Sequence, residues 1–127
     1  IDEDDMEIRN SAILAIANFA SNPENHEGLI EIDCVQQLID MAATSNPVTQ
    51  LRAVAALRGM STNEATRAEI VRKGALGPLL RLSQAEDVEI QMEVLSTLCN
   101  LSLCGCIGEN PIEFLDACDI HTLVSFL

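Results

Sequence analysis

The chain reads AIANFA over Ala15–Ala20, ALRGMS over Ala56–Ser61 and TLCNLS over Thr97–Ser102. These three related strings are forty-one residues apart. A fixed period in this range is typical of a stacked array, in which each unit buries its apolar face against its neighbours. Such arrays are usually surfaces that hold other molecules, so the repeat predicts a binding protein without identifying its partner.

Each unit has the apolar spacing of helices. Its apolar residues recur three or four positions apart, which is not the alternation of a strand. Pro follows Asn at 22–23 and 46–47, where a helix can begin, because the N–H that Pro lacks is unpaired in a first turn. Gly74 marks a sharp turn. We expect a short first helix, a second helix and a longer third helix in each unit. The stripe of the N-terminal segment consists of Ile8, Ala12, Ala15, Ile16 and Phe19.

Several stretches resemble armadillo repeats. They are NPENH at Asn22–His26, IVRKGALGPLL at Ile70–Leu80 and the three strings quoted above. The resemblance, to arrays of the catenin and importin-alpha kind, covers essentially the whole chain. It implies an all-α fold, a right-handed α-solenoid of stacked three-helix repeats. It is less specific for function, because one fold carries many functions.

We expect the chain to be a single armadillo-repeat domain over 1–127. The alignment of the three strings divides this domain into repeat units. Arrays normally end in repeats with a polar outer face. The sequence ends instead on the apolar run Leu123–Leu127, so we expect a part of a longer array and end-to-end self-association through the exposed ends. The expected units are a third helix of a partial repeat at 1–21, full repeats at 22–61 and 62–103, and the first and second helices of a truncated repeat at 104–127.

Net charge argues against nucleic acid as a partner, and the length of the apolar runs argues against insertion into a membrane. The formal net charge is −13, and phosphate would be repelled by such a surface, so we expect no nucleic-acid binding. Six of the seven basic residues lie between Arg52 and Arg81. This distribution is that of solvated helix faces with an uneven mix of charges, or alternatively of a basic belt flanked by acidic ends that would steer a partner of mixed charge. No apolar run has the length needed to cross a bilayer, so we expect no direct membrane insertion.

The cysteines do not form a disulfide framework. Five of them, an odd number, are expected to be mostly small buried residues in a reducing compartment. We therefore expect a cytoplasmic protein, with the nucleus as an alternative. Cys104 and Cys106 form the one cluster, a minority candidate for a redox pair. A zinc site there would need ligands from Cys99, Cys118 or His121, which are distant in sequence.

Catalytic motifs are absent from the sequence. His26 and His121 have no neighbouring nucleophile in a recognisable motif, and there is no phosphate-binding glycine loop. We predict no catalytic residue, no metal, no cofactor and no enzyme activity.

The resemblance directs attention to a groove lined by the third helices. It implies that the Asn of each repeated string points into this groove and hydrogen-bonds the backbone of an extended peptide, since an amide offers both a donor and an acceptor. Asn18 and Asn100 would have this role, whereas Gly59 replaces the middle Asn. Residues four and seven positions earlier share the same helix face. They are Ser11 and Leu14, Arg52 and Ala55, and Glu93 and Ser96.

Small residues in the middle unit leave two interpretations open. Import adaptors of this family carry Trp four residues before each Asn, where this chain has Leu14, Ala55 and Ser96, so the match to import-signal binding is incomplete. A shallow hollow beside Arg52 would accept a bulky or acidic side chain. Alternatively, Gly59 and Ala55 only let another helix pack closely.

The sequence therefore predicts a non-enzymatic scaffold for protein–protein interaction. An extended or helical segment of a protein or peptide partner would lie along the concave groove, with Asn18 and Asn100 on its backbone and with Arg52 and Glu93 setting side-chain preference. The alternatives are a nuclear-transport-type cargo adaptor and a purely structural spacer in a longer array.

Overall fold

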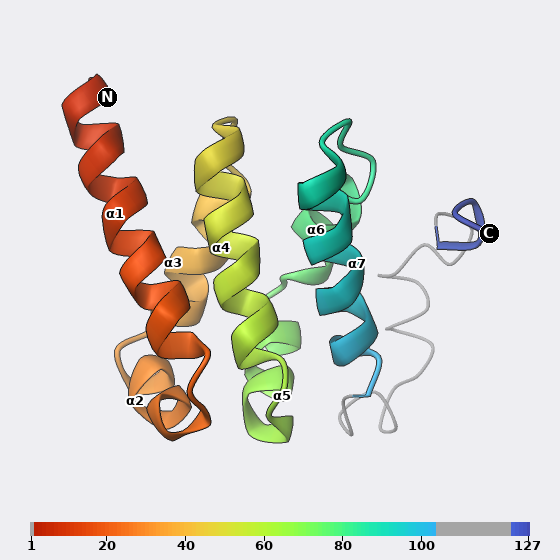
Figure 1. Ribbon diagram of the computed structural model, residues 1–127. Helices are drawn as coiled ribbons and strands as arrows, with labels where there is room; N and C mark the ends of the chain where they lie inside the picture. The colour runs from red at the N-terminus through yellow and green to blue at the C-terminus, as the bar shows by residue number, and fades with distance from the viewer. Residues whose placement is uncertain (1, 104–122) are drawn as a thin grey trace.

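The computed structural model describes residues 2–103 and 123–127, and the regular structure of these residues is entirely helical (Figure 1). The prediction of an all-α fold built from three-helix repeats is confirmed. The helices are α1 (Glu3–Ala20), the 3-10 helix η1 (Pro23–Asn25), α2 (His26–Glu31), α3 (Cys34–Ala42), α4 (Pro47–Met60), α5 (Glu64–Arg72), α6 (Leu76–Leu82) and α7 (Val88–Leu101).

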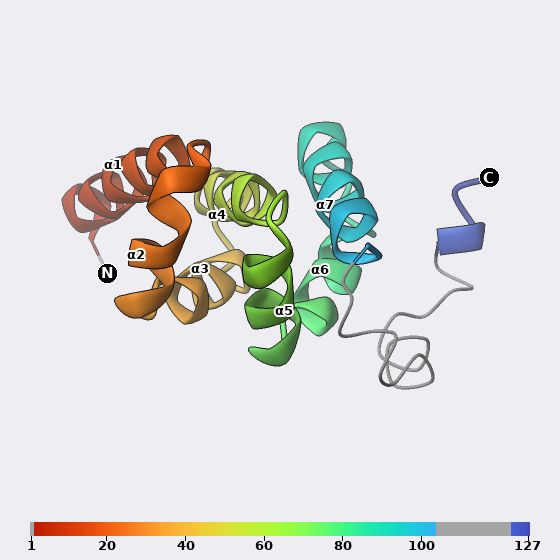
Figure 2. The same ribbon diagram turned by 90° about the horizontal axis from the view of Figure 1, so that it is seen from below.

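The helices form two layers of a short solenoid. The three longest helices, α1, α4 and α7, lie in one layer, and the shorter α2, α3, α5 and α6 lie in the other (Figures 1 and 2). Helix α4 packs against α1 on one side and α7 on the other. The long helices are the predicted third helices, so the fold places them together on one face.

A side-chain cap starts α4 at the predicted Asn46–Pro47 position, and α7 begins with a cap that was not predicted. The Asn46 side chain accepts a hydrogen bond from the Thr49 backbone N–H at 3.0 Å, and Pro47 follows in the first turn. Asp87 caps α7 in the same way, through the Glu89 N–H at 2.9 Å. Such caps pair N–H groups that have no partner within the helix.

In both repeats, one residue in the turn between the first and second helices has a left-handed backbone conformation. Gly74 has φ +86°, as its place in the sequence predicts. Forty-one residues earlier, the same position holds Asp33 with φ +56°, where a side chain is less favourable. The Lys73 ammonium lies 3.2 Å from the Asp33 carboxylate, an exposed ion pair that joins the two turns.

Gly59 allows α4 to approach the end of α1. A Cβ atom at Gly59 would lie 2.9 Å from the carbonyl oxygen of Ala20 and 3.4 Å from the backbone nitrogen of Ser21. The separation of 2.9 Å is too short for a Cβ atom beside a backbone oxygen. Close packing therefore accounts for the glycine at this position.

Four of the five residues in the apolar stripe of α1 are exposed and Ile16 is half-buried, although the same repeat positions are buried further along the array. Ile8 and Phe19 are 68% and 58% exposed, and Ala12 and Ala15 are also exposed. The corresponding positions of α4 and α7 are all buried. They are Thr49, Ala53, Ala56 and Met60 in α4, and Ile90, Val94, Thr97 and Leu101 in α7.

Several predictions concern residues 104–122, which lie outside the described residues. These residues include Cys104, Cys106, Cys118, His121 and most of the truncated repeat. Of the described part, no helix is long and apolar enough to cross a membrane. Within residues 2–103 and 123–127, His, Cys, Asp and Glu side chains form no group of three that could hold a metal ion.

Candidate functional site

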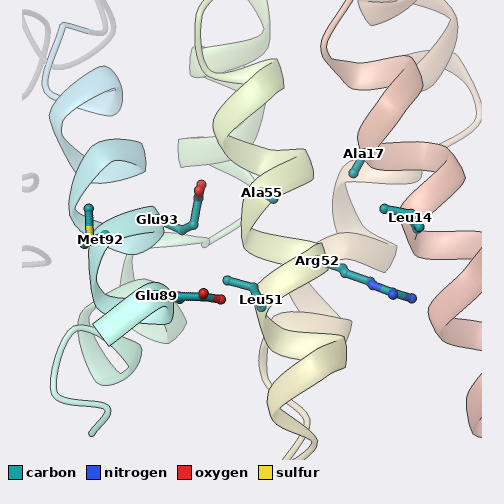
Figure 3. A pocket seen from close by; sticks show the side chains of 8 residues that line it. All are labelled: Leu14, Ala17, Leu51, Arg52, Ala55, Glu89, Met92 and Glu93. Carbon is teal, nitrogen blue, oxygen red and sulfur yellow. The ribbon is translucent and has the colours of Figure 1, made fainter. Parts of the chain in front are cut away.

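A shallow hollow runs across the face formed by α1, α4 and α7 (Figure 3). Its volume is about 440 Å³. Most of its surface is apolar, with charged groups at two places. Its lining residues are Leu14 and Ala17 from α1, Leu51, Arg52 and Ala55 from α4, and Glu89, Met92 and Glu93 from α7.

Four of the predicted groove residues meet in this hollow, and they come from all three long helices. They are Leu14, Arg52, Ala55 and Glu93. Ser11 lies instead at a second surface hollow on α1, with Asp4, Glu7 and Ile8. The remaining predicted residues, Asn18, Gly59, Ser96 and Asn100, do not line the hollow.

The two asparagines have different surroundings. Asn18 is exposed at the end of α1. Asn100 is half-buried, and its side-chain amide donates to the Ser61 hydroxyl oxygen at 3.0 Å. This bond joins α7 to the residue that ends α4, so Asn100 already has a partner within the chain.

Arg52 is held by the neighbouring helix. It extends from α4 toward α1 (Figure 3), and its Nη1 donates to the backbone carbonyl of Asn10 at 2.7 Å. This carbonyl lies on α1, so the bond links the first and second long helices. The Arg52 charge therefore lies on the α1 side of the hollow and is partly satisfied there.

Glu93 is held by the central helix. Its Oε1 accepts from Nη1 of Arg58 at 3.1 Å, across the junction of α4 and α7. Its other oxygen, Oε2, is buried without a hydrogen-bond partner among the described residues. A buried carboxylate oxygen without a donor is costly, because it loses its hydrogen bonds to water without gaining others.

Sequence reasoning missed half of the lining. Glu89 lies one helical turn before Glu93, so extending the same spacing by four residues would have found it. Leu51 and Met92 occupy the same repeat position, directly before Arg52 and Glu93. No signal in the sequence indicates that these two face the hollow, because helix rotation depends on packing.

Cys34 is the one described cysteine in the core. It is 3% exposed at the start of α3, whereas Cys99 is exposed on α7. Burial raises the pKa of the Cys34 thiol, and the negative charge of Asp33 raises it further. A thiol held in its protonated form is a poor nucleophile, so Cys34 has the properties of a packing residue.

Comparison with known proteins agrees with this architecture. Residues 63–103 match the armadillo/beta-catenin-like repeat. Vacuolar protein 8 of Schizosaccharomyces pombe is 33% identical over 93 residues, which cover 73% of this chain and 16% of that protein. Rap1 GTPase-GDP dissociation stimulator 1-A of Xenopus laevis is 30% identical over 89 residues, 67% of this chain and 15% of that protein.

A similar fold is also known from solved structures. The crystal structure of computationally designed armadillo repeat proteins for modular peptide recognition matches with a TM-score of 0.78 at 25% identity, over 87% of this chain and 48% of that one. The chain belongs to the armadillo-repeat family, a class of solenoid that binds proteins and peptides. It spans only 16% and 15% of the two natural relatives above.

Proposed function

We propose that the chain is a non-enzymatic scaffold that binds an extended segment of a protein partner in the hollow across α1, α4 and α7. The observation that supports this proposal is the lining: eight residues from three successive long helices form one continuous and mostly apolar surface (Figure 3). A segment crossing the three helices would contact each repeat once. The structural likeness to designed peptide-binding armadillo proteins favours the same kind of ligand.

The hollow offers both contact area and fixed charges. Leu14 and Met92 are exposed large apolar side chains at opposite ends of the lining, and burying them under a partner would supply much of the binding energy. Ala55 lies between them and leaves room for a partner side chain. In this proposal the charges of Arg52 and Glu93 set orientation, because charged groups at an interface contribute mainly to specificity.

A substitution that fills the hollow tests this proposal. Ala55→Phe places a ring in the middle of the groove, and Ala65→Phe, on an exposed position of α5, is the matched control. A phage-displayed library of twelve-residue peptides is panned on the wild-type protein, and selected peptides are measured on both variants. We expect Ala55→Phe to abolish binding and Ala65→Phe to leave it unchanged, with helical circular dichroism preserved in both.

The outcomes separate the alternatives. Equal binding to both variants would place the site outside the hollow. No selected peptide at all would contradict peptide binding and favour a structural spacer. A cargo adaptor for import signals would select peptides with several consecutive Lys or Arg residues. Two relatives are named as stimulators of GDP dissociation from Rap1 GTPase, so a folded GTPase is a further partner to test.

A further inference from the structure

The side of α1 that faces away from α4 has an exposed apolar surface. Helix α1 lies at one edge of the layer of long helices, with α4 beside it (Figures 1 and 2). Its exposed stripe consists of Ile8, Ala12, Ala15 and Phe19. On an α-helix these four side chains project within a sector of roughly 60°, turned away from the buried residues Ile13 and Ala20. The stripe therefore offers one continuous face to a further helix.

The sizes of the side chains in this stripe read the same in both directions. The order is large, small, small, large, and the steps along the chain are four, three and four positions. Alternating steps of three and four keep side chains along one seam between two helices. If a second α1 lies antiparallel to the first, Ile8 faces Phe19 of that copy and Ala12 faces its Ala15. The stripe is thus complementary to itself, as a symmetric two-fold interface requires.

The small centre of the stripe lets two helices approach closely. Helices that meet through Ala side chains pack near the short end of the usual range of about 8–10 Å between axes. Ile8 and Phe19, which are 68% and 58% exposed, would then enclose the Ala pairs from both ends. Burial of these two large side chains supplies the driving force for association, because it removes apolar surface from water.

Charge favours an antiparallel pair over a parallel one. The first turn of α1 contains Glu3, Asp4 and Asp5, and its last turn contains no basic residue. In a parallel pair the two acidic turns would lie side by side and repel each other. In an antiparallel pair they lie at opposite ends of an 18-residue helix, about 27 Å apart, which exceeds the Debye length of about 8 Å at physiological salt. The net charge of −13 on each copy still opposes association when salt is low.

A second copy of the chain matches the stripe better than the other long helices do. A helix of a different protein would need the same order of side-chain sizes, whereas a second α1 has it necessarily. Within the described residues, α7 offers no equivalent stripe for a head-to-tail contact, because its residues at these repeat positions are buried inside the chain.

We propose that the exposed stripe of α1 binds the same stripe of a second copy of this chain, with the two helices antiparallel and Ile8 of each copy opposite Phe19 of the other. The hollow takes no part in this contact. Its α1 residues, Leu14 and Ala17, lie outside the stripe, so each copy keeps an open hollow. The pairing is therefore independent of the proposed function.

Two charge substitutions test both the contact and its orientation. Ile8→Lys and Phe19→Glu are made singly and together. In an antiparallel pair of the double variant, each introduced ammonium lies opposite an introduced carboxylate. In a parallel pair, like charges would meet instead. Sedimentation velocity over a range of protein concentrations, at physiological salt, gives the dissociation constant of each dimer.

The matched control is the double variant Gln37→Lys, Gln84→Glu. It adds the same two charges at exposed positions outside α1, so its net charge equals that of the double test variant. Circular dichroism and thermal unfolding confirm that every variant is folded. Positions 8 and 19 are both exposed, so the substitutions leave the core unchanged.

We expect the wild-type chain and the control to form a dimer and no larger species. Each single variant should dimerise at least about tenfold more weakly, because the contact would bury an unpaired charge. The double variant should dimerise about tenfold more tightly than either single variant, because opposite charges then face each other at both ends of the stripe.

Three results would overturn this pairing. A double variant that dimerises no more tightly than the single variants would contradict the antiparallel orientation. Equal dimerisation of all five proteins would place the contact outside the stripe. A wild-type chain that stays monomeric, or that grows beyond a dimer as its concentration rises, would exclude a closed two-fold contact through α1.

Discussion

Asn18 and Asn100 occupy the same repeat position but have different surroundings. The Asn100 amide donates to the Ser61 hydroxyl across the α4–α7 junction, whereas Asn18 is exposed. We expect Asn100→Ala to lower the free energy of unfolding by about 1 kcal/mol, the usual net value of one hydrogen bond. Asn18→Ala is the matched control and should change it by less than about 0.5 kcal/mol. Urea unfolding followed by circular dichroism measures both, and equal losses would show that the bond contributes nothing.

The Cys34 thiol makes stability depend on pH. Its folded-state pKa is raised above the ordinary value of 9.0, by burial first and by Asp33 second. The folded state then keeps the proton that the unfolded chain releases. This contribution is fully present below pH 9 and is lost as the pH rises through the folded pKa.

We therefore expect the wild-type chain to lose more stability between pH 7 and pH 10 than Cys34→Ala does. Urea unfolding at the two pH values gives the difference, and comparison of the two proteins removes the contribution of other groups. Thiol labelling at pH 7.5, located by peptide mass spectrometry, should modify exposed Cys99 well before buried Cys34. Parallel pH curves for the two proteins would argue against an altered thiol pKa.

The close approach of α4 to α1 depends on the absence of a side chain at Gly59. A Cβ atom at Gly59 would lie 2.9 Å from the Ala20 carbonyl oxygen, and backbone cannot move aside as a flexible side chain can. We expect Gly59→Ala to lower the free energy of unfolding by about 1–3 kcal/mol, a typical cost of overpacking. Thermal and urea unfolding measure this loss.

Gly28 in α2 is the control for Gly59, because a Cβ atom there would meet nothing within 4 Å. Gly28→Ala should raise stability by about 0.5–1 kcal/mol, since Ala loses less conformational freedom in a helix. Stabilisation by both substitutions would mean that the two helices can separate slightly at no cost.

Helix starts and turns could be predicted from the sequence where a local rule decides them. Asn46 caps α4 and Gly74 takes a positive φ, both as expected. The left-handed backbone conformation of Asp33 was not predicted, because an Asp in a turn does not by itself indicate a positive φ. The turn between the first and second helices sets this conformation, and Gly74 occupies the same position of that turn in the next repeat.

The groove was predicted in outline and only partly in detail. Helical spacing placed Leu14, Ala55 and Glu93 on one face, and the structure brings them together. The hydrogen bond from the Arg52 guanidinium to the Asn10 carbonyl was not predicted. Such contacts depend on the distance and rotation between helices, which the packing of whole side chains determines and periodicity alone does not.

The exposed stripe of α1, defined by Ile8, Ala12, Ala15 and Phe19, is the largest departure from the repeat pattern at the scale of the whole molecule. The same positions are buried in α4 and α7, so this face has the chemistry of a helix–helix contact without its partner helix. The chain is therefore expected to self-associate through α1. The acidic first turn of α1 opposes this, and salt screens such repulsion, so association should strengthen as ionic strength rises.

Sedimentation velocity over a range of concentrations and two salt levels measures this self-association. Phe19→Glu replaces the largest apolar side chain of the stripe by a charged one and should leave a monomer at every concentration. Ile32→Glu, at a position 71% exposed in the turn after α2, adds the same charge elsewhere and should associate like the wild-type chain. A wild-type monomer at high concentration and high salt would show that the exposed stripe of α1 does not cause self-association. Association that Phe19→Glu leaves intact would instead place the contact on another face, because no copy could bury the stripe together with an unpaired charged side chain.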